Sequence, residues 1–158
     1  TKNARRDYIA GQFEALMDNI KKFWSEIDAG HSKAEIEYNE ERMVVGLRDD
    51  NGAWIELERA DGEGDASSGQ FEKAILCMAM AKIESTGVEY PIFIDDAMGD
   101  MDPNHRARAV DSAARHFGQV IFATNQPDAY SDLLEFDLIL HAENTKSKER
   151  CVTRKEAS

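Results

Sequence analysis

Two neighbouring carboxylates at the end of an apolar run are the residues best suited to chemistry in this sequence. The stretch Tyr90-Pro-Ile-Phe-Ile-Asp-Asp96 has the pattern of a buried strand that ends in Asp95 and Asp96. Ligands of an open α/β sheet bind at the carboxyl ends of its strands. One carboxylate could hold a phosphate-bound magnesium ion while its neighbour orients and deprotonates a water molecule. The structural alternative is that both aspartates only begin a turn.

Two further aspartates follow in Asp100-Met101-Asp102-Pro103. Asp102 and Pro103 have the order of an N-cap and a first helical residue, and capping alone is sufficient to explain Asp102. Capping does not explain Asp100.

A second candidate site is the stretch Ala66-Ser67-Ser68-Gly69-Gln70, which stands directly before a predicted helix from Phe71. Free amides at a helix N-terminus and the helix dipole both favour a bound phosphate. The structural alternative is that Ser67 or Ser68 serves only as an N-cap.

The start of the chain has the pattern of an amphipathic helix. Its apolar residues recur in alternating steps of four and three, the spacing of coiled-coil a and d positions; they are Ile9, Phe13, Leu16, Ile20, Phe23 and Ile27. This spacing predicts a helix that pairs with a partner helix and stops at Gly30. The alternative is that the helix packs on the core of its own domain.

The remaining pattern predicts an α/β protein. Period-two alternation over 34–38, 43–47 and 53–57, with the turn Asp49–Gly52, indicates an antiparallel β-meander. A βαβ alternation follows, because helical and short apolar segments take turns; they are the helix 70–84, the strand Pro91–Ile94, the helix Pro103–Phe117, the strand Val120–Ala123, a short helix from Pro127 and the strand Phe136–Leu140. We expect Glu143–Ser158 to be a disordered polar tail.

Composition limits the function further. The 158 residues carry 19 Lys plus Arg against 31 Asp plus Glu, a net charge of −12, so a basic surface that wraps nucleic acid is excluded for this chain alone. Its two cysteines, Cys77 and Cys151, form no disulfide or zinc pattern. With no apolar run long enough to span a bilayer, we expect a cytoplasmic location, nucleoid-associated if DNA is the partner, and no membrane. The first residue is Thr, so we expect a piece of a longer protein.

The order of these segments resembles the C-terminal half of the ATPase head of SMC-type ABC proteins, including RecF, RecN and SbcC-like proteins. Ala66–Gln70 stands where the family has Leu-Ser-Gly-Gly-Gln, Asp95-Asp96 stands at the end of the Walker B strand, and Gly99–Asp102 resembles the D-loop. The resemblance implies that residues 1–29 are the end of a coiled-coil helix. It also implies that residues 30–158 are the C-terminal lobe of an ABC-type head.

The same resemblance assigns roles to individual residues. It implies that ATP is bound by Ser67, Ser68, Gly69 and Gln70 together with Asp102 of the D-loop. Ser67 and Gly69 would touch the γ-phosphate held by the opposite head. Asp95 would reach Mg²⁺, and Asp96 would be the catalytic carboxylate. Asn125 occupies the switch position where most ABC proteins have His, and an amide can bond a phosphate oxygen but cannot become cationic.

The implied partners follow from what the sequence lacks. No Gly-x-x-x-x-Gly-Lys-Ser/Thr loop occurs in this chain, and in SMC-like proteins that loop belongs to an N-terminal lobe. The resemblance therefore implies ATP and Mg²⁺, a Walker A-containing N-terminal lobe on the same or a separate chain, an ATP-dependent head dimer, DNA, and a nuclease partner.

Two alternative functions stay open at this point. In a TOPRIM-like nuclease, Asp100 and Asp102 would bind magnesium, although the upstream Glu-Gly strand of that fold is missing and Ser67–Gln70 would have no role. In a non-catalytic SMC-like scaffold, the heptad helix would bind a partner protein, and Asn125 is the feature that favours this hypothesis.

The assignment of Asp96 gives a first prediction. In the complete head, Asp96→Asn should leave ATP binding intact but stop hydrolysis, because the amide keeps the shape yet cannot accept a proton from water. ATP-bound dimers should accumulate, as measured by light scattering beside phosphate release. If Asp96→Asn hydrolyses ATP normally while Asp95→Asn does not, the two roles are reversed.

Overall fold

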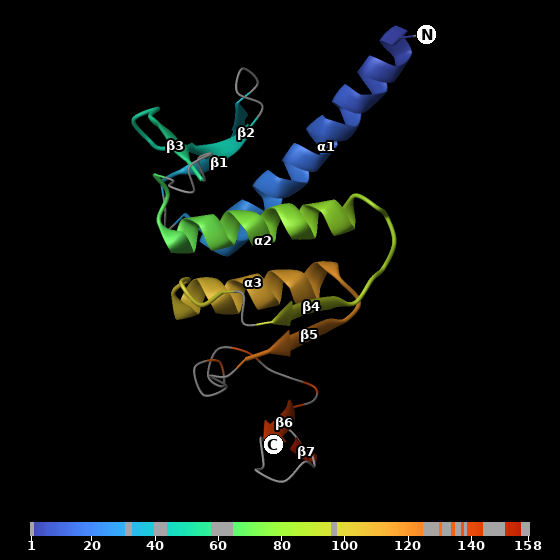
Figure 1. Ribbon diagram of the computed structural model, residues 1–158, viewed down its shortest axis with the longest axis vertical. Helices are drawn as coiled ribbons and strands as arrows, with labels where there is room; N and C mark the ends of the chain where they lie inside the picture. Colours follow the sequence, from blue (N-terminus) through green and yellow to red (C-terminus); the bar gives the residue numbers. More distant parts are fainter. Residues whose placement is uncertain are drawn as a thin grey trace.

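The computed structural model describes residues 2–30, 33–39, 44–57, 65–95, 98–124, 130, 134, 137, 139–143 and 151–155. Three helices and seven strands are assigned among these residues (Figure 1): α1 (Lys2–Asp28), β1 (Glu35–Asn39), β2 (Val44–Arg48), β3 (Trp54–Glu56), α2 (Ser68–Glu84), β4 (Ile92–Asp95), α3 (Pro103–His116), β5 (Val120–Ala123), β6 (Ile139–Glu143) and β7 (Cys151–Lys155). None of the three helices combines the length and the apolar character needed to cross a membrane.

Helix α1 runs from Lys2 to Asp28, within the predicted helical segment 1–29. Ala29 and Gly30 follow with φ angles of 46° and 75°, a left-handed turn that glycine adopts at no steric cost. The expected stop at Gly30 is confirmed.

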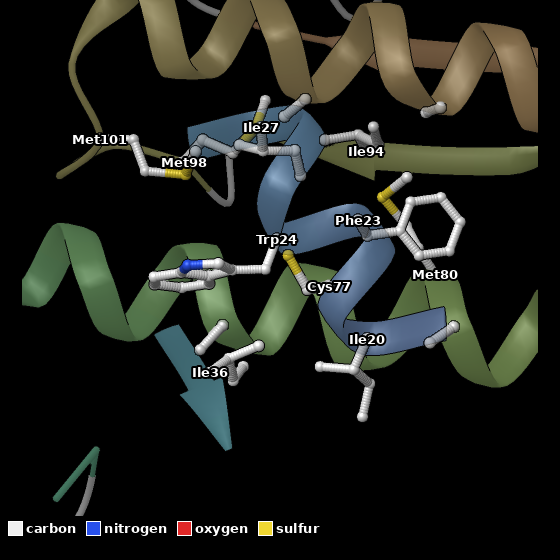
Figure 2. Close-up of a cluster of buried hydrophobic side chains, with 14 of the residues drawn as sticks. Ile20, Phe23, Trp24, Ile27, Ile36, Cys77, Met80, Ile94, Met98 and Met101 are labelled. Atoms are coloured by element: carbon white, nitrogen blue, oxygen red, sulfur yellow. The ribbon is translucent and has the colours of Figure 1, made fainter. Parts of the chain in front are cut away.

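The second half of α1 belongs to the core of this chain. Ile20, Phe23 and Ile27 are at most 2% exposed, and Phe23 and Ile27 lie between α2 and α3 (Figure 2). Trp24 on the same turns donates its indole N–H to the carbonyl of Ala34 at 3.0 Å. The prediction that the whole seam pairs with an outside helix is therefore wrong from Ile20 onward, because the chain's own helices already cover these side chains.

The predicted meander is present as a three-stranded antiparallel sheet in the order β1-β2-β3. Ile36 pairs with Leu47, and Leu47 pairs with Ile55. Ile36 and Leu47 are buried, so one face of the sheet packs on the core as period-two alternation requires. In the predicted turn, the carboxylate of Asp49 accepts the backbone N–H of Ala53 at 2.7 Å.

Strands β4 and β5 run parallel and pair Phe93 with Ile121, which confirms the expected parallel sheet. Ile92 and Ile94 are buried. Phe93 and Ile121 on the other face are 62% and 45% exposed. The sheet is therefore covered on one face only within the described part of this chain, whereas parallel sheets are almost always covered on both.

The C-terminal part differs from expectation. Residues 151–155 form β7, which pairs antiparallel with β6, so the prediction of a disordered tail over Glu143–Ser158 is wrong there. The predicted strand Phe136–Leu140 is displaced, since β6 covers Ile139–Glu143. The predicted helix from Pro127 lies outside the described residues.

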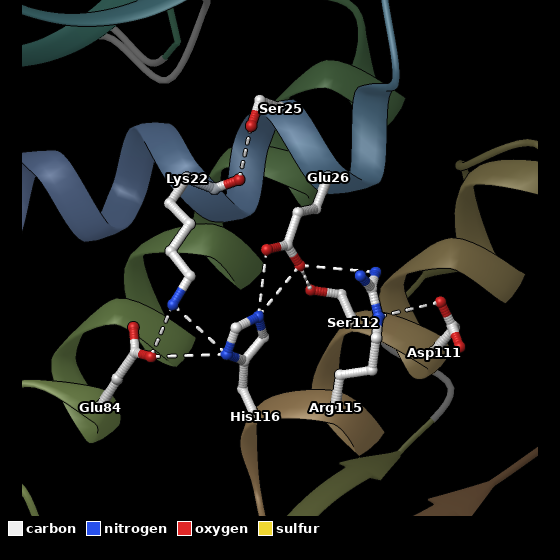
Figure 3. Close-up of polar contacts among 8 residues, drawn as sticks. All are labelled: Lys22, Ser25, Glu26, Glu84, Asp111, Ser112, Arg115 and His116. Carbon is white, nitrogen blue, oxygen red and sulfur yellow. Dashed lines mark hydrogen bonds and ion pairs between the residues drawn. The ribbon is translucent and has the colours of Figure 1, made fainter.

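A cluster of polar side chains joins α1, α2 and α3 (Figure 3). Glu26 of α1 accepts the hydroxyl of Ser112 at 2.6 Å and lies 3.0 Å from Nε2 of His116, both on α3. Lys22 donates to Glu84 of α2 at 2.8 Å. Burial raises the pKa of Glu26, but the hydrogen bonds and the nearby charge of His116 outweigh it and leave that pKa below its ordinary value. The contribution of Glu26 to stability is therefore lost as the pH falls through this lowered pKa.

The burial of α1 gives a second prediction. Phe23→Ala should lower the free energy of unfolding by about 3–5 kcal/mol, because it leaves a cavity in the core. Gln12→Ala, on an exposed position of the same helix, should change it by less than about 0.5 kcal/mol. Urea denaturation followed by tryptophan fluorescence gives both values. A Phe23→Ala cost below about 1 kcal/mol would mean that this part of α1 is not core.

Candidate functional site

The Ser67–Gln70 turn is built as a capping box at the start of α2. The hydroxyl of Ser67 accepts the backbone N–H of Gln70 at 3.3 Å, and the side chain of Gln70 accepts the backbone N–H of Ser67 at 3.0 Å. Ser67 and Ser68 are exposed, and α2 has no acidic side chain in its first turn. The turn therefore combines the expected N-cap with an exposed helix N-terminus of favourable polarity for an anion.

Gly69 has a role that the sequence did not reveal. A Cβ at this position would lie 2.8 Å from the backbone carbonyl oxygen of Asp100, so only glycine lets the start of α2 approach the loop after β4 so closely. From α2, Glu72 accepts the backbone N–H of Asp100 at 2.9 Å. The predicted anion turn and the predicted D-loop segment are therefore in direct contact.

Asp102 is the N-cap of α3, as Asp102-Pro103 predicted. Its carboxylate accepts the backbone N–H groups of Asn104 and His105 at 2.9 and 3.2 Å and pairs with the His105 ring. Desolvation raises the pKa of Asp102, but the bonds and charge from His105 outweigh it and leave that pKa below its ordinary value. The capping alternative is thus realised, and a contact of Asp102 with ATP stays a prediction.

Asp95 ends β4 as an exposed residue. It lies on the same face of the strand as Phe93, opposite the buried Ile92 and Ile94. An exposed carboxylate at a strand end suits Mg²⁺, which proteins hold through one or two carboxylates together with substrate phosphates. Within the described ranges, no group of three or more His, Cys, Asp or Glu side chains could by itself hold a metal ion.

Asp96 and Asn125 both lie outside the described residues. Asp95, directly before Asp96, pairs across the parallel strands with Ala123, two residues before Asn125, and both strands therefore end at the same edge of the sheet.

A buried ion pair joins α2 to the end of α1. Lys73 of α2 pairs with Asp28, the last residue of α1, and both side chains are at most 4% exposed. The Lys73 ammonium also lies 4.2 Å from the centre of the Trp24 ring. Nε2 of His105 lies 3.8 Å from the Asp28 carboxylate. The end of α1 and the starts of α2 and α3 are thus joined by ionisable side chains, a link between distant positions for which the sequence carries no signal.

Comparison with solved structures identifies the fold. The chain aligns over 95% of its length with 89% of a chain from a study of ATP-driven dimerization and DNA-stimulated activation of SMC ATPases, with a TM-score of 0.69 and 13% identity. It also resembles, at a TM-score of 0.62 and 13% identity over 91% of its length, an Smc head bound to the C-winged helix domain of ScpA. The same values describe its likeness to an Smc head domain with an extended coiled coil bound to the C-terminal domain of ScpA from Pyrococcus furiosus.

These likenesses confirm the expected fold, the α/β architecture of SMC ATPase heads. No family model and no curated protein sequence matches the chain. The chain spans 43% and 35% of the two ScpA-bound head chains, less than half of each. The fold gives no support to the TOPRIM-like alternative, and Asp102, one of its two proposed ligands, is held as a helix cap.

The close approach at Gly69 gives a third prediction. Gly69→Ala should lower the free energy of unfolding by about 1–3 kcal/mol, because the new methyl group meets a backbone oxygen that cannot move aside without displacing the loop. Gly99→Ala is the matched control, because a Cβ there has no heavy atom within 4 Å. Urea denaturation of both variants tests the contact. Equal stabilities would show that the turn and the loop do not touch.

Proposed function

We propose that this chain is the ATP-binding C-terminal lobe of an SMC-like ATPase head that works by ATP-driven head dimerisation. Its biological setting would be DNA repair, recombination, chromosome organisation or phage defence. One observation carries the proposal: on an SMC-head fold, the exposed Ser67 turn packs directly against the loop that follows the Asp95 strand.

The roles proposed for individual residues follow the sequence analysis. Ser67 to Gln70 and Asp102 would bind ATP, with Ser67 and Gly69 touching the γ-phosphate held by the opposite head. Asp95 would hold Mg²⁺, which supplies positive charge near the phosphates when bound. Asp96 would accept a proton from the attacking water. Asn125 would bond a phosphate oxygen as a neutral donor, and we expect slower turnover than a cationic histidine would give.

A separate Walker A-containing lobe is a further part of the proposal. Phe93 and Ile121 are exposed on the open face of β4 and β5. Because exposure of paired apolar side chains to water is unfavourable, these residues favour a further layer that covers this face. We propose that the lobe covers this face. The head chains solved with ScpA are more than twice as long as the part that this chain matches. Their remaining length is enough to form such a layer.

Residues 1–29 are proposed as the end of a coiled-coil helix, with the pairing limited to the part before Ile20. DNA and a nuclease are proposed partners of the assembled head, and DNA contact would have to be local because the chain carries a net charge of −12. A non-catalytic scaffold is the second candidate, favoured by Asn125 at the switch position.

The fourth prediction tests the assembled site. The chain alone should release no phosphate from ATP, because it lacks the loop and lysine that hold the β- and γ-phosphates. Mixed with the Walker A-containing lobe, it should hydrolyse ATP and pair with a second head. Ser67→Arg should block pairing, and Ser85→Arg, exposed at the other end of α2, should not.

Light scattering and phosphate release measure these outcomes. Steady turnover by the chain alone would contradict the need for a second lobe, and a complete head without any turnover would favour the scaffold. Pairing that survives Ser67→Arg would remove the turn from the site.

Phe93→Ser should weaken binding of the lobe without unfolding the chain, and unchanged binding would place the lobe elsewhere.

A further inference from the structure

Arg106 of α3 contacts two segments that follow different strands. Its guanidinium donates from Nε to the carbonyl of Met101 at 2.6 Å and from Nη2 to the carbonyl of Gly99 at 2.5 Å. Its third nitrogen, Nη1, lies 3.4 Å from the hydroxyl of Tyr130. The first two contacts hold the loop after β4, and the third reaches the segment after β5.

The described part of the loop after β4, residues 98–102, is held at several points. Arg106 donates to the carbonyls of Gly99 and Met101. Between them, the backbone N–H of Asp100 donates to the Glu72 carboxylate of α2. The absence of a side chain at Gly69 lets α2 approach the Asp100 carbonyl. Met98 and Met101 of this part are buried in the core. Only the planar fork of arginine, with five N–H donors, can meet two carbonyls and a hydroxyl at once.

Tyr130 carries the link to β5. It is 2% exposed, and its ring packs edge to face on Phe122 of β5 with centroids 4.8 Å apart. A buried tyrosine hydroxyl needs a hydrogen-bond partner, and Arg106 provides a charged one. Displacement of the loop after β4 would therefore strain the Arg106 contacts and disturb the packing against β5.

We propose that Arg106 is a positioning residue that locks the loop after β4 and the segment after β5 into one unit. Gly99, Met101 and Tyr130 would then keep a fixed geometry relative to the ends of β4 and β5. The consequence for turnover rests on the proposed ATPase function; the locking itself does not.

The fifth prediction begins with the chain alone. Arg106→Ala should raise amide hydrogen exchange at Asp100 and Met101 at least tenfold, because both carbonyl contacts that flank these amides are lost. Arg106→Lys should rescue only part of the protection, since one ammonium cannot replace the fork. Arg115→Ala is the matched control: it lies on the same helix but pairs with Glu26 and Asp111, and the loop amides should stay protected.

The link to Tyr130 is tested by a double-mutant cycle. Tyr130→Phe removes the hydroxyl alone and should raise loop exchange slightly, and combining it with Arg106→Ala should add nothing further. Additive effects would overturn the link to the segment after β5. Unchanged exchange in Arg106→Ala would overturn the proposal altogether.

A final measurement separates positioning from simple stabilisation. In the assembled head, Arg106→Ala should lower kcat about tenfold while the Kd for ATP stays within about twofold, because no nucleotide contact is removed. Faster loop exchange with an unchanged kcat would make Arg106 structural only. If the wild-type head shows no turnover, the proposed function fails, and the exchange data still decide whether Arg106 locks the two segments.

Discussion

The last turns of α1 lie between α2 and α3, and the placement of both helices depends on this one contact. Phe23 and Ile27 are fully buried there, and Asp28 brings a carboxylate into the core, where it must be paired. Lys73 from α2 supplies the opposite charge. Removal of one partner of such a pair commonly costs several kcal/mol, because the other charge is left buried.

This arrangement decides where the candidate site lies. The C-terminal end of α1 meets the N-terminal ends of α2 and α3, so the Ser67 turn and the Asp102 cap are brought to the same end of the helices. The contact of Gly69 with the backbone of Asp100 then fixes their spacing. A change in the direction of α1 would therefore first displace the Ser67 turn and the Asp102 cap, the two segments proposed to contact nucleotide.

Local patterns could be predicted from the sequence, and distant pairings could not. The meander, both central helices and the Asp102 cap depend on alternation, periodicity and capping over a few neighbouring residues. The heptad spacing of α1 predicted a helix but not its partner, because a seam looks the same whether an outside helix or the chain's own core covers it. The Ser67–Gln70 spacing is that of a capping box, a signal that could have been used. Burial of Lys73 and the small size required at Gly69 depend on residues many positions away, and β7 was missed because its sequence is polar.

Cys77 lies in the same core, beside Trp24 and Phe23 (Figure 2). Desolvation by burial raises the pKa of its thiol to about 12, so the reactive thiolate is almost absent at neutral pH. Burial and the raised pKa therefore protect the thiol from alkylating reagents while α1 packs against α2. The rate at which an added alkylating reagent modifies Cys77 would therefore report how often α1 separates from α2.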